Sequence, residues 1–272
     1  MLICQISDLH VRTAGSLAYG IVDTAVMLER CVSHILALPQ RPAAVIATGD
    51  LVDFGRPEEY SRLRSLLEPL TMPVYLLPGN HDCRSELGRA FPTHHYLGQS
   101  AEYIQFTVET LPVRIVALDT VVPGQSGGTL CGNRLEWLDR ALSDAPHRPT
   151  IVAMHHPPFL TGIGHMDRIG LSQREDLARI IAAHPQVERI ICGHLHRSIT
   201  TRFGGTLAST CPSPAHQVAL DIDGDAADCF VMEPPGYHLH WWSGGQLVSH
   251  AAVVGDYPGP YPFRKDGHLI DG

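Results

Sequence analysis

The sequence predicts an α/β fold, and three observations support this. Six short runs of aliphatic and β-branched residues are spaced along residues 3–192. Segments with apolar residues at helical spacing lie between these runs. The runs are apolar at nearly every position, which is typical of strands that helices cover in layered α/β proteins. We expect these strands at residues 3–6, 43–47, 74–77, 114–118, 150–154 and 189–192.

The helical patterns have recognisable ends. Pro39 follows the first pattern as a stop, and Pro57 suits the first turn of the second. Ser172 to Glu175 matches a capping box ahead of the last helix. We expect helices at residues 25–36, 57–70, 135–142 and 172–181.

The pattern changes after His196. Residues 199–254 contain short β-like runs broken by Gly, Pro and Asp, which predicts antiparallel strands closing a second sheet. The Pro- and Gly-rich tail is expected to wrap irregularly over the surface. We therefore expect a single domain over residues 1–255 and an irregular C-terminal tail over residues 256–272.

Composition narrows the function. The chain has 272 residues, enough for one large core, and a net charge of −8 that argues against a general nucleic-acid binder. A small phosphorylated substrate stays possible because bound cations can supply positive charge locally. Seven cysteines without a C-x-x-C pair predict buried thiols rather than disulfides. No targeting segment or membrane-spanning run is recognised, so we expect a cytoplasmic protein.

Metal-binding residue types follow five of the predicted strands. Because loops beyond the carboxyl ends of parallel strands converge, these residues should surround one small volume. Carboxylate, imidazole and amide oxygen suit hard or borderline divalent metals. The motifs are Asp8-x-His10, Gly49-Asp50, Gly79-Asn80-His81-Asp82, His155-His156-Pro157 and Gly193-His194-x-His196.

The chemistry follows from a two-metal arrangement. One carboxylate such as Asp50 can bridge two ions about 3.5–4 Å apart, the separation used for in-line displacement at phosphorus. Such ions neutralise phosphate oxygens and lower the pKa of bound water. We therefore expect attack by water without a covalent enzyme intermediate. Gly49, Gly79 and Gly193 would let the backbone bring the ligands close together.

These five motifs, in this order, resemble the calcineurin-like metallophosphoesterases. The chain is further similar to bacterial class III cyclic-nucleotide and glycerophosphodiester phosphodiesterases at residues 1–10, 49–60, 75–82 and 213–218. The resemblance covers most of the chain and is weakest after about residue 220. It implies a four-layer α/β/β/α sandwich of two mixed β-sheets flanked by helices.

The resemblance also implies two divalent metal ions, with Mn, Fe, Zn and Co as candidates. In the family the first histidine of H-H-P is the ligand, which leaves His156 either in contact with the ligands or packed in the protein interior. The implied ligands are Asp8, His10, Asp50 and His196 for the first metal, and Asp50, Asn80, His155 and His194 for the second.

The predicted catalytic residues are His81, Asp50 and Asn80, and the predicted substrate-binding residues are His81, Asn80 and His216. We assign His81 to phosphate-oxygen binding or leaving-group stabilisation. Asp82 either orients His81 or caps the following turn.

Arg56 has two open roles, reaching a substrate anion or pairing with Glu58 or Glu59. Other histidines receive structural interpretations. We expect His34, His147 and His184 to be solvated, and His238 and His240 to lie on a strand face.

The leading hypothesis is a dinuclear metal-dependent phosphodiesterase for small diesters, such as cyclic AMP or glycerophosphodiesters. Alternatives are a phosphomonoesterase or protein phosphatase on the same fold, and a non-catalytic scaffold. Purple acid phosphatases would carry a tyrosine where Asp53 stands, and scaffolds usually lose ligands.

The expected partners are a small-molecule substrate and further copies of the chain, through helix 57–70 or the later β-rich region, but neither a nucleic-acid polymer nor a membrane.

Overall fold

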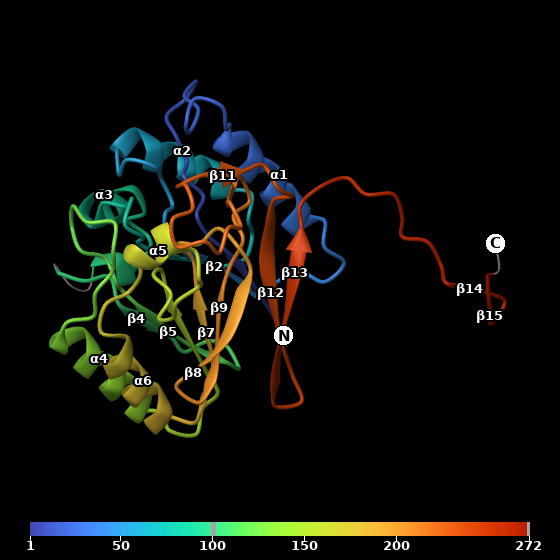
Figure 1. Ribbon diagram of the computed structural model, residues 1–272. Helices are drawn as coiled ribbons and strands as arrows, with labels where there is room; N and C mark the ends of the chain where they lie inside the picture. Colours follow the sequence, from blue (N-terminus) through green and yellow to red (C-terminus); the bar gives the residue numbers. More distant parts are fainter. Residues whose placement is uncertain (99–101, 271–272) are drawn as a thin grey trace.

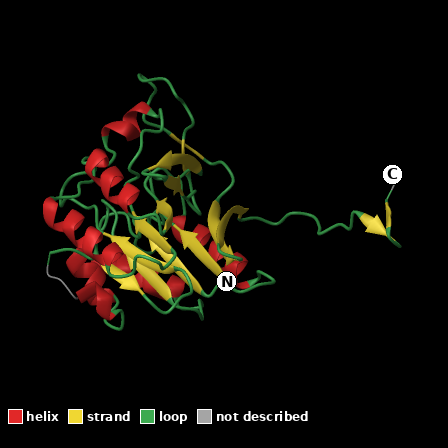
Figure 2. Ribbon diagram, turned by 90° about the horizontal axis from the view of Figure 1, so that it is seen from below, coloured by secondary structure: helices red, strands yellow, loops and turns green. Residues whose placement is uncertain are grey.

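A computed structural model describes residues 1–98 and 102–270. Its body is built on two mixed β-sheets (Figures 1 and 2). In the first sheet, in the order β13-β12-β1-β2-β3, three strands run parallel and the hairpin β12–β13 adds antiparallel to β1. Its strands are β1 (Leu2–Ile6), β2 (Ala44–Thr48), β3 (Val74–Leu77), β12 (Gly236–Ser243) and β13 (Gln246–Val253).

The second sheet has the order β4-β5-β6-β7-β9-β8, with four parallel strands between two antiparallel edges. Its strands are β4 (Phe106–Val108), β5 (Arg114–Leu118), β6 (Thr150–Met154), β7 (Val187–Cys192), β8 (Ile199–Phe203) and β9 (Thr206–Thr210). Two short pairs lie outside these sheets. They are β10 (Gln217–Val218) with β11 (Phe230–Val231), and β14 (Arg264–Lys265) with β15 (His268–Leu269).

Helices cover the outer faces of both sheets. Successive side chains of a strand point to opposite faces of its sheet, and β5 shows which face meets the helices. Ile115 and Ala117 belong to the core that lies between the two sheets, whereas Val116 and Leu118 pack under the helices. The result is the expected four-layer α/β/β/α sandwich. The helices are α1 (Thr24–Leu36), α2 (Pro57–Leu67), α3 (Arg84–Ala90), the 3₁₀ helix η1 (His95–Gly98), α4 (Gly132–Ser143), α5 (Gly164–Arg168) and α6 (Arg174–Ala183).

A buried polar network crosses the space between the sheets. Gln5 of β1 donates through Nε2 to Thr48 Oγ1 at 3.0 Å and to the Cys192 carbonyl at 2.9 Å. His240 of β12 lies with Nε2 3.1 Å from Gln5 Oε1. Every member has a partner, as an apolar surrounding requires. The network therefore joins strands of both sheets directly behind the loops that carry the metal-binding motifs.

Several expectations about the later chain were wrong. Residues 199–254 were expected to form antiparallel strands that close a second sheet, but their strands are divided between the two sheets. β9 pairs parallel with the free edge of β7, and β12 pairs antiparallel with the free edge of β1. Residues 255–270 are exposed and run away from the body instead of wrapping over it (Figures 1 and 2). Among the described residues, no helix is both long and apolar enough to cross a bilayer.

Local details also differ. Ser172 was expected to cap α6, but the N-cap is Gln173, in the left-handed conformation. The Ser172 hydroxyl donates to the Gly128 carbonyl instead. His34 is half-buried, with Nδ1 2.9 Å from the Tyr237 hydroxyl. His184 is buried, with Nε2 2.8 Å from Asp139 Oδ1. Both were expected in solvent, but helical position alone does not reveal a partner from another element.

Candidate dinuclear metal centre

The predicted ligands converge although they come from five separate strands. They lie on the loops that follow β1, β2, β3, β6 and β7. His155 Nε2 lies 3.3 Å from Asp50 Oδ2 and 3.1 Å from Asn80 Oδ1. His10 Nε2 lies 3.7 Å from Asp50 Oδ2 and 3.2 Å from His196 Nε2. One carboxylate therefore stands between two sets of donor atoms, as a bridging ligand must.

The donor atoms form compact groups. In each group the atoms lie within 4.8 Å of one another, which is close enough to contact one ion. The described residues form four such groups, and each contains at least one predicted ligand: Asp8–His10–His196, Asp8–Asp50–His155, His155–His156–His194 and His10–Asp53–His81.

Backbone carbonyls fix which nitrogen of three histidines faces the centre. Because a carbonyl only accepts, the imidazole nitrogen beside it must carry the proton. His155 Nδ1 donates to the Thr48 carbonyl at 2.8 Å, and His196 Nδ1 donates to the His216 carbonyl at 3.0 Å. His194 Nε2 donates to the Ile169 carbonyl at 3.1 Å. Whenever one of these rings is neutral, its opposite nitrogen therefore keeps a lone pair that can bind a cation.

His10 is oriented by a carboxylate that sequence reasoning did not assign. Its Nδ1 lies 3.1 Å from Asp53 Oδ1, and Asp53 Oδ2 accepts from Arg12 at 2.6 Å. The only sequence signal was the position of Asp53, three residues after Asp50. A carboxylate behind a metal-binding imidazole raises its basicity and holds its ring.

The backbone at the centre is strained. Five predicted ligands have positive φ, a conformation that costs non-glycine residues about 1 kcal/mol or more each. Such strain persists where the surrounding structure determines it, and it concentrates at functional sites. The φ angles are 56° for Asp8, 44° for His10, 48° for Asp50, 70° for His194 and 50° for His196.

The three glycines of the motifs permit close approach, as expected. A Cβ on Gly49 would overlap the His155 ring, and one on Gly79 would overlap the Asp50 carboxylate. A Cβ on Gly193 would overlap the Ser7 hydroxyl. Only Gly49 also needs a positive φ, of 96°. Any side chain at these positions would push the ligand loops apart.

The donor set fits divalent cations. Asp8 Oδ2 is buried without a hydrogen-bond partner among the described residues, and such an orphan is costly unless a ligand contacts it. Burial is the main cause that raises the pKa of Asp8 to about 6. Burial, with the neighbouring His155, lowers the pKa of His194 to about 3 and keeps that ring neutral. Buried carboxylates and neutral imidazoles together suit hard to borderline metals.

His155 behaves differently from His194. Burial favours its neutral form, but the Asp50 carboxylate outweighs burial and raises the pKa of His155 to about 9. The Asp50 carboxylate therefore favours positive charge at this position. Metal binding at this position would displace a ring proton.

His156 is engaged on both ring nitrogens, which argues against a ligand role. Its Nδ1 lies 2.8 Å from Thr120 Oγ1, and its Nε2 donates to the Ser126 carbonyl at 3.0 Å. Ser126 belongs to Gly124–Gly128, which reads G-x-S-x-G, the spacing of a serine nucleophile elbow. Here Ser126 is exposed in a long loop between β5 and α4, without the strand-to-helix turn that such a nucleophile needs.

Aromatic rings form a rim beside the centre, in which the His81 side chain is 35% exposed whereas His216 is buried, with 2% exposed. The His81 ring is 4.6 Å from the His10 ring, and its Nδ1 donates to the Asp53 carbonyl at 2.8 Å. The His216 ring is 5.6 Å from His10. Tyr19 stacks edge-on against His216 at 5.1 Å, with its side chain 55% exposed and φ at 50°. Sequence reasoning missed Tyr19, because a tyrosine before a glycine gives no functional signal.

The structure shows which groups Asp82 and Arg56 contact, the two residues whose roles the sequence left open. Asp82 binds groups that precede it in the chain, so it caps the preceding turn rather than the following one: Oδ2 accepts from the backbone N–H groups of Leu51 and Gly79, and Oδ1 accepts from the Tyr60 hydroxyl. The Arg56 guanidinium lies 5.0 Å from the centre of the Phe54 ring. Among the described residues, no ion pair joins Arg56 to Glu58 or Glu59.

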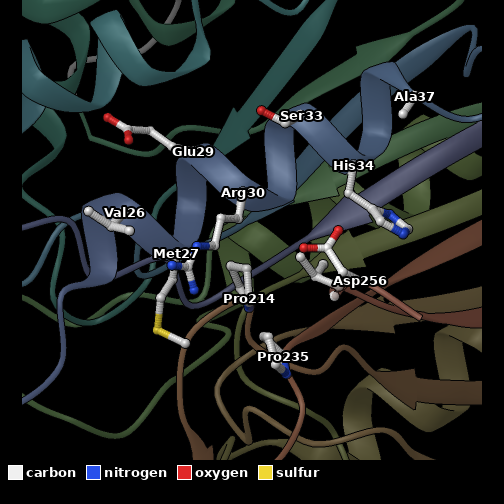
Figure 3. Close-up of a pocket in the computed structure, with 12 residues that line it drawn as sticks. Val26, Met27, Glu29, Arg30, Ser33, His34, Ala37, Pro214, Pro235 and Asp256 are labelled. Carbon is white, nitrogen blue, oxygen red and sulfur yellow. The ribbon is translucent and has the colours of Figure 1, made fainter. Parts of the chain in front are cut away.

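A separate groove lies along the outer side of α1, next to Pro214, Pro235 and Asp256 (Figure 3). It is lined by Arg30, His34 and neighbouring residues of the helix. None of the seven predicted ligands lines it, so it is distinct from the metal centre.

Comparison with known proteins places the chain in a family. The family model of the calcineurin-like phosphoesterases matches residues 1–198. A probable glycerophosphodiester phosphodiesterase of Arcobacter nitrofigilis is 40% identical over 274 residues, covering 100% of both chains. A 3',5'-cyclic adenosine monophosphate phosphodiesterase of Pseudomonas aeruginosa is 31% identical, covering 94% of this chain and 91% of the relative.

Among solved structures, a dimetal phosphatase of Danio rerio superposes with a TM-score of 0.67 at 16% identity, covering 94% of this chain and 97% of the other. That likeness concerns the fold alone. The chain belongs to the calcineurin-like phosphoesterase family. The family implies a dinuclear divalent metal centre, for which the donor groups described above are the candidates. The chain is a metal-dependent phosphoester hydrolase.

Proposed function

We propose that the chain hydrolyses small phosphodiesters, with glycerophosphodiesters and cyclic nucleotides as the candidate substrates. The observation that carries this proposal is the position of Asp50, within 3.7 Å of His10 on one side and 3.3 Å of His155 on the other. The names of relatives covering more than nine-tenths of the chain support the two substrate classes.

The residues would divide the work between two ions. Bound divalent cations supply positive charge for the phosphate oxygens and lower the pKa of coordinated water. Oxygen and nitrogen donors leave Mn, Fe, Zn and Co as candidates. Asp8, His10, Asp50 and His196 would hold the first ion, and Asp50, Asn80, His155 and His194 the second.

His81 would act on the substrate directly. Its Nδ1–H is committed to the Asp53 carbonyl, so its Nε2 is the atom left for the substrate. The protonated ring has an N–H at Nε2 that can bind a phosphate oxygen or protonate the departing alkoxide. The side chain is 35% exposed, which leaves room for this contact.

The rim would select the group attached to phosphate. His216 lies 4.6 Å from His196, and both Tyr19 and Phe230 contact its ring. An aromatic surface beside the phosphate position offers packing for the second organic substituent, which a diester carries and a monoester lacks. This favours diesters over the alternative of a broad phosphomonoesterase.

A substrate panel tests the proposal. Protein reconstituted separately with Mn²⁺, Zn²⁺ or Co²⁺ is assayed with glycerophosphoethanolamine, cyclic AMP, bis(p-nitrophenyl) phosphate and p-nitrophenyl phosphate. We expect higher kcat/KM for the diesters than for the monoester, and loss of all turnover after chelation. Preference for the monoester with every metal would contradict the proposal.

We also propose that the chain assembles into a homo-oligomer. β13 is an edge strand of eight residues, paired on one side by β12 and without a charged side chain. Val248 and Val253 on it are 36% and 45% exposed. Long uncharged edges favour pairing with another strand. Light scattering that gives the mass of one chain, 29.7 kDa, would contradict this.

A further inference from the structure

A partly exposed thiol stands at the start of α4, outside the metal centre. Cys131 is the N-cap residue of this 12-residue helix. A Cβ on the next residue, Gly132, would meet nothing within 4 Å, so a small molecule can approach the helix start. A helix N-terminus favours negative charge and therefore the thiolate over the thiol. This position alone makes no site, but two neighbouring side chains act on the same sulfur.

The first of these side chains is Tyr103, whose hydroxyl lies 3.5 Å from Cys131 Sγ. A tyrosine hydroxyl can donate to a thiolate, and a thiolate has no proton of its own to donate. The contact therefore favours the ionised sulfur. The pKa of Tyr103 is raised, chiefly by its hydrogen bond with Cys131, which keeps the phenol protonated as the donor.

The second side chain is Arg134, a buried guanidinium with an unused donor. Only 4% of the side chain is exposed, and its Nε has no hydrogen-bond partner among the described residues. Its Nη1 donates to the carbonyls of Asp119 and Val121 at 3.0 Å and 3.1 Å, and its Cζ lies 4.6 Å from the centre of the Tyr103 ring. These contacts fix the guanidinium beside the Cys131 thiol, where its unused N–H calls for a negatively charged acceptor.

These contacts make Cys131 more acidic than a free thiol. Burial opposes ionisation, but Tyr103 and then Arg134 outweigh burial and lower the pKa of Cys131 to about 7. A free cysteine has a pKa of about 8.5 and is about 1% ionised at pH 6.5, whereas a pKa of about 7 gives about one quarter. The thiolate is the form of cysteine that attacks electrophiles and oxidants.

We propose that Cys131 is a site of oxidative modification, at which a hydroperoxide converts the thiolate to a sulfenic acid. The sulfur attacks one oxygen of the hydroperoxide, and the O–O bond breaks. Cys131 is oxidised to Cys–SOH, and the other oxygen leaves as hydroxide or alkoxide and takes up a proton from water. A low-molecular-weight thiol can then attack the sulfenic sulfur, which releases water and leaves a mixed disulfide.

The loop of residues 119–131, which precedes α4, connects this thiol to the second predicted metal position. Arg134 binds two carbonyls at the start of the loop. Further along it, Thr120 Oγ1 and the Ser126 carbonyl hold the two ring nitrogens of His156. The His156 ring lies 4.8 Å from the ring of the predicted ligand His155. A polar adduct on the sulfur would draw the guanidinium away from these carbonyls and loosen the loop, so oxidation should slow hydrolysis.

Alkylation tests the reactivity of the thiol independently of turnover. Protein loaded with Zn²⁺, which has no redox chemistry of its own, is treated with iodoacetamide at pH 6.5, and mass spectrometry follows each cysteine. We expect Cys131 to react about fivefold faster than the exposed Cys229, because its thiolate fraction outweighs the lower nucleophilicity of an acidic thiol. Tyr103→Phe keeps the ring beside Arg134 but removes the hydroxyl, and it should slow Cys131 about threefold. Equal rates at Cys131 and Cys229, or in the parent and Tyr103→Phe, would overturn the proposal.

Peroxide treatment tests the consequence. The Zn²⁺-loaded protein is exposed to hydrogen peroxide, sulfenic acid is captured with dimedone, and hydrolysis of bis(p-nitrophenyl) phosphate is measured in a parallel sample. We expect dimedone on Cys131 before Cys229, and a fall in kcat of about fivefold that dithiothreitol reverses, the scale of coupling through packed networks. Cys131→Ser, which keeps a helix-capping residue, should start at the parent rate and retain it, whereas Cys229→Ser should respond as the parent does. Absence of dimedone from Cys131, or an equal loss of rate in Cys131→Ser, would overturn the proposal.

Discussion

Asp53 Oδ1 lies 3.1 Å from His10 Nδ1, on the opposite side of the imidazole from the other predicted ligands. The same carboxylate binds Arg12, and its backbone carbonyl accepts from His81 Nδ1. One residue therefore holds the ring of a predicted metal ligand, His10, with its side chain and the ring of a predicted substrate-binding residue, His81, with its main chain. Its pKa is lowered: burial opposes this, but contacts with His10 and Arg12 outweigh burial.

Removal of the Asp53 charge should weaken the first metal position. Asp53→Asn keeps an oxygen that can accept from His10, whereas Asp53→Ala loses both the charge and the hydrogen bond. We expect metal affinity to fall about 10-fold in the first variant and about 100-fold in the second, since partners of ligating histidines contribute on that scale. Metal content after dialysis measures this. Asp144→Asn, at an exposed site, is the control, and unchanged retention in Asp53→Ala would refute the role.

Asn80 is the one predicted ligand that is not a histidine or aspartate, and its Oδ1 lies 3.1 Å from His155 Nε2. Asn80→Ala should retain the second metal more weakly and lower kcat at subsaturating metal. Excess metal should restore part of the rate, because the remaining donors are intact. Asn133→Ala, on the exposed surface of α4, is the matched control. Full metal occupancy and an unchanged rate in Asn80→Ala would contradict the assignment.

His81→Ala separates leaving-group assistance from metal binding. An alkoxide needs protonation as it departs, whereas p-nitrophenolate does not. We expect kcat to fall about 100-fold for a glycerophosphodiester and much less for bis(p-nitrophenyl) phosphate. His95→Ala, at an exposed histidine of η1, should leave both rates unchanged. Equal losses on both substrates, with intact metal content, would assign His81 to phosphate binding alone.

Acid stability should depend on His238 of β12. Burial, with a contribution from Arg189, lowers the pKa of His238 to about 4. The folded state thus binds the proton more weakly than the unfolded chain, whose histidine pKa is about 6.5. The stability contributed by the neutral ring is complete above pH 6.5 and is lost as pH falls toward 4.

At pH 5 this loss is about 2 kcal/mol. His238→Gln, which keeps a polar partner for Ser198, should show a smaller drop in the free energy of unfolding between pH 7 and pH 5. Urea denaturation at the two pH values measures the drop, with the exposed His147→Gln as control. An identical drop in parent and His238→Gln would show that His238 does not titrate on unfolding.

The sequence predicted the six principal strands and the convergence of the motifs, because both depend on local patterns. Buried parallel strands are apolar throughout, and β3, β5 and β6 have the predicted bounds. The ligand roles of Asp8 and His194 stay predictions. That the loops carrying them lie close together could be predicted because both follow the carboxyl ends of parallel strands.

Other features depend on contacts between distant segments. Asp53 gains its position from the loop after β2, and Tyr19 reaches His216 through a turn closed by Ala18 and Val22. No local pattern encodes those distances. The placement of β12 beside β1 joins residues more than 230 positions apart, and only the open edge of β1 explains it.

Because β12 pairs with β1, the stretch that carries the predicted ligands ends earlier in the chain than the stretch needed to complete the sheets. All seven predicted ligands lie within residues 1–198, the stretch that the family shares most recognisably. Yet β1, which leads into Asp8 and His10, is paired on one side by β12, and β7, which leads into His194 and His196, is paired on one side by β9. A chain cut after residue 198 would contain the donor atoms of all seven predicted ligands. However, β1 and β7 would become unpaired sheet edges, and such edges favour aggregation of the metal-free chain.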